Sequence, residues 1–131
     1  MAEKRIFWLD TEQVIKIHRI VLRSYGGAEG GGHRGFNYEG VEAAVQAVKN
    51  SYYENLRELG AAYAVYIVQG HVFQDGNKRT GATSMLTFLD ANGRRSSLNF
   101  EALARPMIEM QERAERGERT ENLIDWLSGK V

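Results

Sequence analysis

The sequence predicts a single all-α domain of about six helices, and two observations carry this prediction. Pro106 is the only proline in the chain, and the apolar residues recur mostly at three- and four-residue steps, the spacing of one face of a helix. A length of 131 residues provides for one hydrophobic core. We find neither an internal repeat nor a domain boundary, so the predicted domain covers residues 1–131.

The first expected helix begins at Asp10 or Thr11. Asp10 and Gln13 have the spacing of a capping box, in which each side chain bonds the other residue's backbone N–H. The apolar face that follows consists of Val14, Ile17, Val21 and Tyr25. We expect the helix to end where residues 26–35 begin, because this segment includes six glycines, and we predict a loop or flap there.

Three helices are expected in the middle of the chain. The second begins near Glu39, the third covers about residues 55–70, and the fourth begins near Asn77 or Lys78 and ends at Asn92. The third has so wide an apolar surface that we predict it to be the central, buried helix. The residues expected to face the core are Val41, Ala44, Val45 and Val48 in the second helix, Leu59, Ala62, Tyr63, Tyr66 and Ile67 in the third, and Met85, Phe88 and Leu89 in the fourth.

Two further helices complete the predicted fold. Asn99 is a candidate cap for the fifth, in which Pro106 either produces a kink or lies near the true start, and Thr120 is a candidate cap for the sixth. Their expected core residues are Leu103, Met107, Met110, Leu123, Ile124, Trp126 and Leu127. Glutamates and arginines alternate over residues 109–119, which is typical of a solvated helix surface with three- and four-residue ion pairs.

Charge and composition exclude several classes of function. Lysine and arginine number 17, as do aspartate and glutamate, so no bulk charge attracts nucleic acid or an anionic membrane. The absence of cysteine excludes disulfides, a thiolate nucleophile and a cysteine zinc site. No apolar run is long enough to span a bilayer, and residues 1–10 lack the apolar core of a signal peptide. We therefore expect a cytoplasmic protein with neither a membrane nor a nucleic-acid partner.

Residues 71–81 have the features of a phosphate-binding segment: His-Val-Phe-Gln-Asp-Gly-Asn-Lys-Arg-Thr-Gly. A loop that ends at a helix start presents unpaired backbone N–H groups to an anion, and Gly76 permits a tight turn. Lys78 and Arg79 would lie in the first helical turn, where positive charge opposes the helix dipole unless an anion offsets it. Such a local conflict is typical of a functional site.

Three other side chains of this segment suggest chemistry or support. Asp75 is a carboxylate beside the expected anion site and suits Mg²⁺, which prefers one or two carboxylates together with phosphate oxygens. His71 belongs to the residue type most often used as a general base, and its imidazole can accept a proton from a hydroxyl nucleophile. Phe73 is apolar between polar neighbours, so we expect it to fix the loop to the core.

The segment resembles the motif of the Fic/Doc family, His-x-Phe-x-(Asp/Glu)-Gly-Asn-Gly-Arg-x-x-Arg, and is closest to the Doc (death-on-curing) form, His-x-Phe-x-(Asp/Asn)-x-Asn-Lys-Arg. The matching residues are His71, Phe73, Asp75, Asn77, Lys78 and Arg79. An amphipathic helix that leads to Tyr-Gly-Gly is similar to the start of Doc proteins. The resemblance covers nearly the whole chain and implies a helical fold with the active loop between two core helices.

The resemblance implies a role for each motif residue. His71 is the general base, Asp75 holds Mg²⁺, and Gly76, Asn77, Lys78 and Arg79 bind the nucleotide phosphates. Proteins of the family that transfer AMP have glycine at the position of Lys78. A lysine there accompanies a reversed orientation of ATP, and the expected reaction is then phosphorylation. Ala82 replaces the second arginine of the AMP-transferring form, whereas Gly76 matches that form.

The function implied by the resemblance is that of a Doc-type toxin kinase, which transfers the γ-phosphate of ATP to a serine or threonine of a protein such as elongation factor Tu. The alternatives are transfer of AMP or another nucleotide, and a catalytically silent binding module. The family's inhibitory (Ser/Thr)-x-x-x-Glu-(Gly/Asn) segment is not found, so a separate antitoxin protein is the expected partner.

Other glycine and histidine patterns favour simpler interpretations. Residues 30–35 fit G-x-G-x-x-G, but a helix precedes them and no βαβ pattern follows, which excludes a dinucleotide fold. The three histidines lack the spacing of metal ligands. His18 lies among the apolar positions of the first helix, so we expect a hydrogen-bonded core residue, and His33 is a loop residue with no visible partner.

Overall fold

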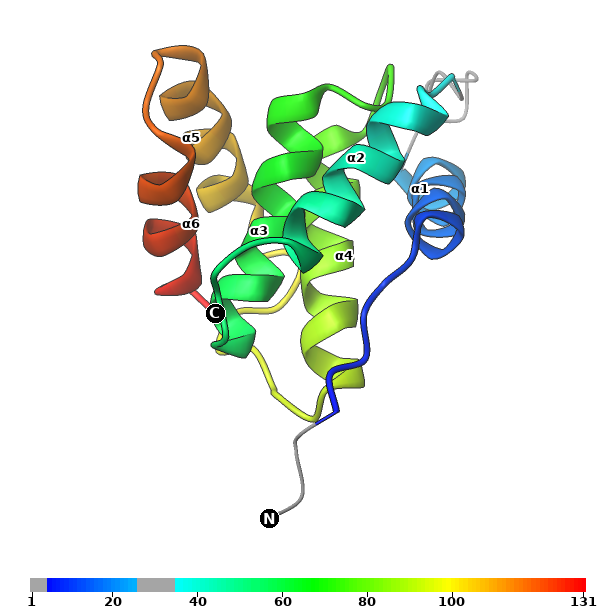
Figure 1. The fold of residues 1–131 in the computed structure, drawn as a ribbon. Helices are drawn as coiled ribbons and strands as arrows, with labels where there is room; N and C mark the ends of the chain where they lie inside the picture. The colour runs from blue at the N-terminus through cyan, green and yellow to red at the C-terminus, as the bar shows by residue number, and fades with distance from the viewer. Residues whose placement is uncertain (1–4, 26–34) are drawn as a thin grey trace.

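The computed structural model describes residues 5–25 and 35–131. Six α-helices make up this part of the chain (Figure 1): α1 (Thr11–Tyr25), α2 (Tyr38–Lys49), α3 (Leu56–Gly70), α4 (Asn77–Ala91), α5 (Ala104–Glu115) and α6 (Thr120–Ser128). The predicted all-α class is confirmed. The predicted flap, the G-x-G-x-x-G segment and His33 lie outside the described residues, apart from Gly35.

Helix α3 lies at the centre of the molecule, as its wide apolar surface predicted. It contacts α2, α4, α5 and α6, while α1 packs against α2 and α4 (Figure 1). Leu59, Ala62, Tyr63 and Ile67 are buried as expected, whereas Tyr66 is only partly buried. No helix in the described ranges is long and apolar enough to cross a membrane.

The contact between α3 and α4 is close because a glycine lies at the crossing. A Cβ atom on Gly81 of α4 would lie 3.2 Å from the carbonyl oxygen of Ala64 and 3.3 Å from its Cα. Both distances are shorter than ordinary Cβ contacts, and because the neighbouring atoms belong to the backbone, no side-chain rotation could relieve them. Gly81 therefore allows the two helices that flank the loop at residues 71–76 to approach closely.

The N-terminal part of the chain is held by two sets of hydrogen bonds. The backbone N–H of Gln13 donates to Asp10 Oδ1 at 2.8 Å, and the Asp10 N–H donates to Gln13 Oε1 at 2.8 Å, which confirms the predicted capping box. The Tyr63 hydroxyl donates to the carbonyl of Leu9 at 3.1 Å and accepts from its N–H at 2.9 Å. The segment before α1 is thus bound to the central helix.

Two predicted helix starts near the C-terminus differ in the structure. Asn99 caps a turn at residues 100–103 through the N–H of Ala102, and α5 begins only afterwards, with Pro106 in its first turn. The prediction that Thr120 caps the sixth helix is wrong, because Arg119 is the cap residue. The Thr120 hydroxyl instead donates to Gln69 Oε1 of α3 at 2.8 Å.

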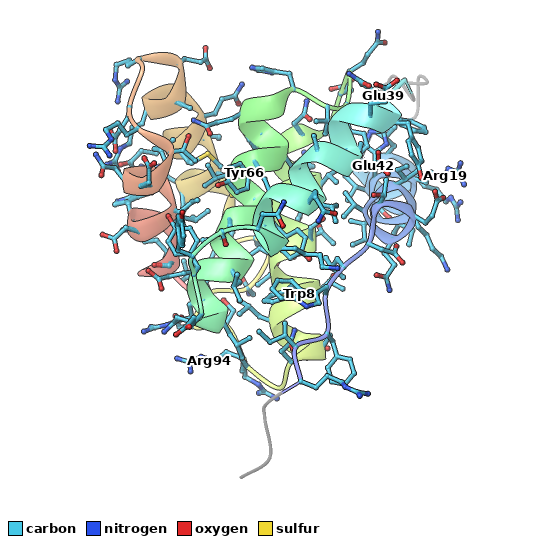
Figure 2. All side chains as sticks on the ribbon, in the orientation of Figure 1. Trp8, Arg19, Glu39, Glu42, Tyr66 and Arg94 are labelled. Atoms are coloured by element: carbon cyan, nitrogen blue, oxygen red, sulfur yellow. The ribbon has the colours of Figure 1, made fainter. Side chains whose placement is uncertain are left out.

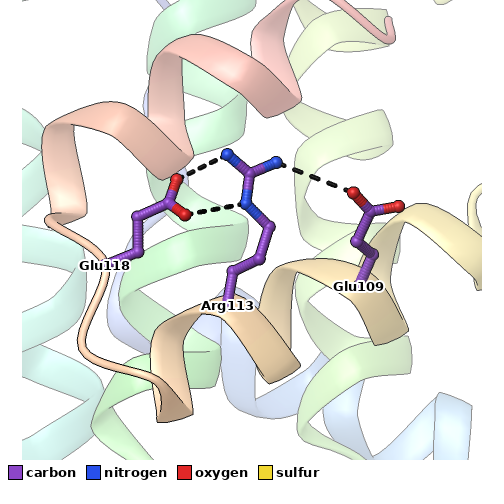
Figure 3. A network of polar contacts seen from close by, with 3 residues as sticks. All are labelled: Glu109, Arg113 and Glu118. Atoms are coloured by element: carbon purple, nitrogen blue, oxygen red, sulfur yellow. Dashed lines mark hydrogen bonds and ion pairs between the residues drawn. The ribbon is translucent and has the colours of Figure 1, made fainter.

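The turn between α5 and α6 is closed by the three-residue network of Figure 3. Arg113 Nε donates to Glu118 Oε1 at 2.9 Å, and Arg113 Nη1 lies 3.7 Å from Glu109 Oε2. The hydrogen bond from Arg113 lowers the pKa of Glu118. The guanidinium also lies over the ring of Trp126, 4.6 Å from its centroid, so Arg113 joins the two helices through stacking as well as charge.

Charged side chains cover the outer faces of the helices. Figure 2 shows Arg19 on α1 and Glu39 and Glu42 on α2 at the outside of the molecule, while Trp8 points inward, its ring 6.1 Å from that of Phe88. The apolar faces of all six helices in the described part of the chain thus surround one core, and the loop at residues 71–76 lies at the edge of that core.

Candidate active site

The candidate site is built on the loop that joins α3 to α4. His71 ends α3 with a left-handed backbone (φ 47°, ψ 44°), and among the described residues other than glycine it alone has a positive φ. This conformation is strained for a residue with a Cβ atom. The His71 side chain is exposed and borders a small cavity of about 160 Å³, lined also by Gln69, Gln111 and Glu115.

Phe73 attaches the loop to the core, in agreement with its expected supporting role. Its side chain is only 2% exposed, and its ring is stacked on the imidazole of His18 with centroids 3.9 Å apart. An isolated antiparallel bridge joins Phe36 to Phe73, so the chain just before α2 runs beside the loop. The loop is therefore held from two directions, by α1 and by the start of α2.

The side chain of Asn77 closes the loop from within. Its Oδ1 accepts from the Phe73 N–H at 3.1 Å, and its Nδ2 donates to the Phe73 carbonyl at 2.7 Å. Both polar atoms of this amide are thus bound to the loop's own backbone. The expected contribution of Asn77 to phosphate binding consequently rests on its backbone N–H group in the first turn of α4.

Asp75 and Gly76 form the last peptide unit before α4. The Asp75 side chain is exposed, and its Oδ1 accepts from the Gly76 N–H at 3.1 Å. Gly76 has φ 78° and provides no side-chain cap for α4. The first turn of α4 therefore has no capping side chain on its N-cap residue, which leaves its N–H groups for an anionic ligand.

Lys78 and Arg79 add positive charge beside a largely apolar cavity. The cavity has a volume of about 340 Å³ and lies between α4 and the segment that contains α5, a size typical of small-molecule sites. Lys78, Arg79 and Ala82 line it from α4, and Phe100, Glu101, Ala104, Met107 and Ile108 line it from the other side. A largely apolar cavity lined by two cations and one carboxylate, Glu101, fits a ligand with an aromatic part and a phosphate part.

The carboxylates of the site fit a metal ion only when the ligand supplies further oxygens. Within residues 5–25 and 35–131, no group of three or more acidic, histidine or cysteine side chains is arranged to hold a metal ion. Asp75 is nevertheless an exposed carboxylate at the anion site. Mg²⁺ is commonly bound by one or two carboxylates together with substrate phosphates, so the donor set suits Mg²⁺ bound together with a nucleotide.

Two parts of the site could not be found from the motif. His18 is buried as predicted, but its hydrogen bond to the carbonyl of Asp75, at 2.9 Å, joins residues 57 positions apart. The far wall of the larger cavity includes Phe100 and Ile108, which lie outside the motif. The sequence signal for that wall was the apolar residue Phe100, which directly follows Asn99, the candidate cap of the fifth helix.

Comparison with known proteins agrees with this geometry. The model of the Fic/DOC family matches residues 8–89, which include α1 to α3, the loop between α3 and α4, and all but the end of α4. The chain therefore belongs to the Fic/DOC family. Over 87 residues it is also 38% identical to the protein kinase doc of Escherichia phage P1, an alignment that covers 65% of this chain and 68% of that protein. This similarity places the chain in the Doc branch.

Proposed function

We propose that this protein is a Doc-type kinase that transfers the γ-phosphate of ATP to a serine or threonine hydroxyl of another protein. One observation carries the proposal: α4 begins without a side-chain cap, and its first turn contains Lys78 and Arg79, which line the cavity between α4 and the segment that contains α5. His71 lies at the other end of the same loop. In this proposal the target hydroxyl binds between His71 and a phosphate group held at the start of α4.

The proposed reaction needs one proton transfer and one phosphoryl transfer. His71 accepts the proton of the target hydroxyl, whose oxygen forms a bond to the γ-phosphorus as the bond to the bridging oxygen of ADP breaks. Lys78, Arg79 and the N–H groups at the start of α4 offset the charge of the phosphates. Asp75 is the proposed ligand of Mg²⁺, which would neutralise phosphate charge when it is bound.

The wall of the cavity favours transfer of the γ-phosphate over transfer of AMP. Ala82 is a small, buried side chain on this wall, where AMP-transferring members of the family have an arginine. Lys78 occupies the position where those members have glycine. Gly76 does not discriminate between the two reactions, because its φ of 78° accounts for a glycine there without reference to chemistry.

The wider role is proposed from similarity to the Doc branch. In this proposal the protein acts in the cytoplasm as the toxin of a toxin–antitoxin pair, and its substrate is a translation component such as elongation factor Tu. A separate antitoxin restrains it, and neither nucleic acid nor a membrane is a direct partner. The balance of 17 basic and 17 acidic side chains supports the last point.

The proposal is tested by label transfer. The purified protein is incubated with Mg²⁺ and a bacterial lysate, in parallel with γ-labelled and α-labelled ATP, and His71→Ala is the control. We expect label in a protein band from the γ-position only, and we expect the mutant to lose it. Label from the α-position would instead establish AMP transfer, and no label from either position, with nucleotide still bound, would indicate a silent binding module.

A further inference from the structure

His18 is a buried polar side chain that the proposed chemistry does not use. It lies on α1, is 1% exposed, and its Nε2 atom is 2.9 Å from the carbonyl oxygen of Asp75. Its ring is stacked on Phe73 at an interplanar angle of 14°. An apolar side chain of similar size would fill this space without the cost of burying an imidazole, so the hydrogen bond is the feature that distinguishes histidine here.

The partner of His18 determines the state of the ring. A carbonyl oxygen only accepts, so Nε2 must carry the hydrogen that it donates. Burial lowers the pKa of His18 below its ordinary value, although the hydrogen bond and the charge of Asp75 oppose this effect and Arg19 adds to it. The contact with the carbonyl oxygen therefore requires a hydrogen on Nε2.

A planar peptide unit transmits the constraint from His18 to the carboxylate of Asp75. The carbonyl of Asp75 and the N–H of Gly76 belong to the same peptide unit, which is rigid and flat. That N–H donates to Oδ1 of Asp75 at 3.1 Å. A hydrogen bond from His18 to the carbonyl oxygen therefore fixes the direction of the N–H, and the N–H in turn orients the carboxylate.

The two ends of the loop are thus held by different side chains. Asn77 fixes the backbone at Phe73 through two hydrogen bonds, and His18 fixes it at Asp75. Gly76, with φ 78°, has no side chain that could cap α4 or hold this peptide unit. Without His18, rotation of the unit would move the Gly76 N–H and the Asp75 carboxylate together.

We propose that His18 is a positioning residue that acts through the Asp75–Gly76 peptide and holds the carboxylate of Asp75 in the orientation that binds Mg²⁺ with the nucleotide. The inference rests on the proposed function, because it assigns Asp75 to the metal. It predicts a specific effect: loss of the His18 hydrogen bond weakens the Mg²⁺-dependent part of nucleotide binding and leaves the Mg²⁺-independent part nearly unchanged.

Calorimetric titration with a non-hydrolysable ATP analogue, in Mg²⁺ and in EDTA, tests this effect. His18→Phe keeps an aromatic ring against Phe73 and removes the donor, and we expect it to weaken binding in Mg²⁺ by about tenfold and in EDTA by less than about twofold. His18→Gln places an N–H donor near the original Nε2 and should restore most of the affinity. Ser84→Ala is the matched control, because it removes a buried hydroxyl that has no hydrogen-bond partner.

Three outcomes overturn the proposal or its basis, and they are distinguishable. Wild-type affinity of His18→Phe in both titrations, even with lower thermal stability, would show that His18 only supports the core. If the wild-type protein binds the analogue equally in Mg²⁺ and EDTA, the assignment of Asp75 to the metal fails first. If His18→Phe does not fold, His18→Gln is compared with His18→Asn, whose amide cannot reach the Nε2 position, and equal affinities would again reject the proposal.

Discussion

At the scale of single residues, His71 combines a strained backbone with the proposed chemistry. A left-handed conformation costs a residue with a Cβ atom roughly 1–2 kcal/mol, and asparagine tolerates it better than most residues. We expect His71→Asn to abolish label transfer from γ-labelled ATP, and to raise the free energy of unfolding by up to about 1 kcal/mol. Denaturant unfolding and the transfer assay measure the two effects separately.

His71→Ala is the control for this trade between stability and activity. Alanine removes the proposed base, but it does not adopt a positive φ more readily than histidine. The free energy of unfolding of His71→Ala should therefore stay near that of the wild type. A loss of stability in His71→Asn would show that the side chain of His71 stabilises the fold, and that its conformation is not a cost accepted for function.

The second prediction at the residue scale concerns the contribution of the Tyr63 hydroxyl to the free energy of unfolding. Tyr63→Phe leaves the N–H and C=O of Leu9 without their partner, which should lower the free energy of unfolding by about 1–3 kcal/mol at neutral pH. Burial raises the pKa of Tyr63 to about 12. The folded protein therefore retains this proton between pH 10, the ordinary pKa, and pH 12, where the unfolded chain loses it.

The sign of the pH effect follows from that difference in proton binding. The stability that the Tyr63 proton contributes is complete below pH 10 and declines as the pH rises towards 12. The gap between wild type and Tyr63→Phe should hence narrow over this range in urea unfolding experiments. Tyr52→Phe is the control, because the Tyr52 side chain is fully exposed, and its effect should be negligible at every pH.

At the scale of the elements, the sequence predicted the helix caps and helix boundaries that depend on residues close together along the chain. The capping box at Asp10, the third helix over about residues 55–70 and the start of the fourth near Asn77 or Lys78 all follow from local rules, and the structure confirms them. Thr120 was misassigned because its hydroxyl bonds Gln69, 51 residues away. The position of the loop was also predicted from neighbouring residues, because the motif is a continuous segment of the sequence.

The parts of the candidate site that sequence did not predict depend on tertiary contacts. The contact of His18 with Asp75 joins α1 to the loop across 57 residues, and neither residue carries a local sign of it. The cavity wall at Phe100 belongs to a segment whose position depends on how α5 packs against α4. The conformation of His71 is likewise set by the loop that follows it, not by its own preference.

The crossing of α3 and α4 is tested by a pair of glycine substitutions. Gly81→Ala places a Cβ atom 3.2 Å from the carbonyl oxygen of Ala64, so the helices must separate, and we expect a loss of about 1–3 kcal/mol. Gly60→Ala is the matched variant, because its Cβ atom meets only side-chain atoms, the nearest being Leu89 Cγ at 3.2 Å. Its helix propensity gain of about 1 kcal/mol should offset part of the cost of shifting those side chains, so we expect a smaller loss than in Gly81→Ala.

Thermal unfolding of the two variants decides whether the backbone contact is responsible. A greater loss in Gly81→Ala than in Gly60→Ala is the expected order. Equal losses would mean that the core adjusts to both substitutions alike, and that close approach of the helices is not a requirement of the fold.

At the scale of the whole molecule, we expect the site and the core to unfold together, because the loop of the site is packed on the core. The loop is bound to α1 through His18, to the start of α2 through Phe36, and to the core through Phe73. The described helices surround one hydrophobic cluster. A ligand that binds at the start of α4 therefore binds only the folded state, because no part of the described site lies on a separately folded unit.

This coupling predicts a specific thermal shift. At a concentration of ligand 100 times its dissociation constant, binding to the folded state alone adds about 2.7 kcal/mol of stability, which for a domain of this size raises the unfolding temperature by roughly 10 °C. We expect Mg²⁺ with a non-hydrolysable ATP analogue to produce such a shift by calorimetry, and Mg²⁺ without nucleotide to produce none, since Asp75 does not hold the ion without phosphate oxygens.

Asp75→Asn should retain the shift given by nucleotide in EDTA and lose the increment that Mg²⁺ adds. An equal Mg²⁺ increment in Asp75→Asn would remove this carboxylate from the proposed site, and a shift from Mg²⁺ without nucleotide would show that the folded protein holds the ion through its own side chains.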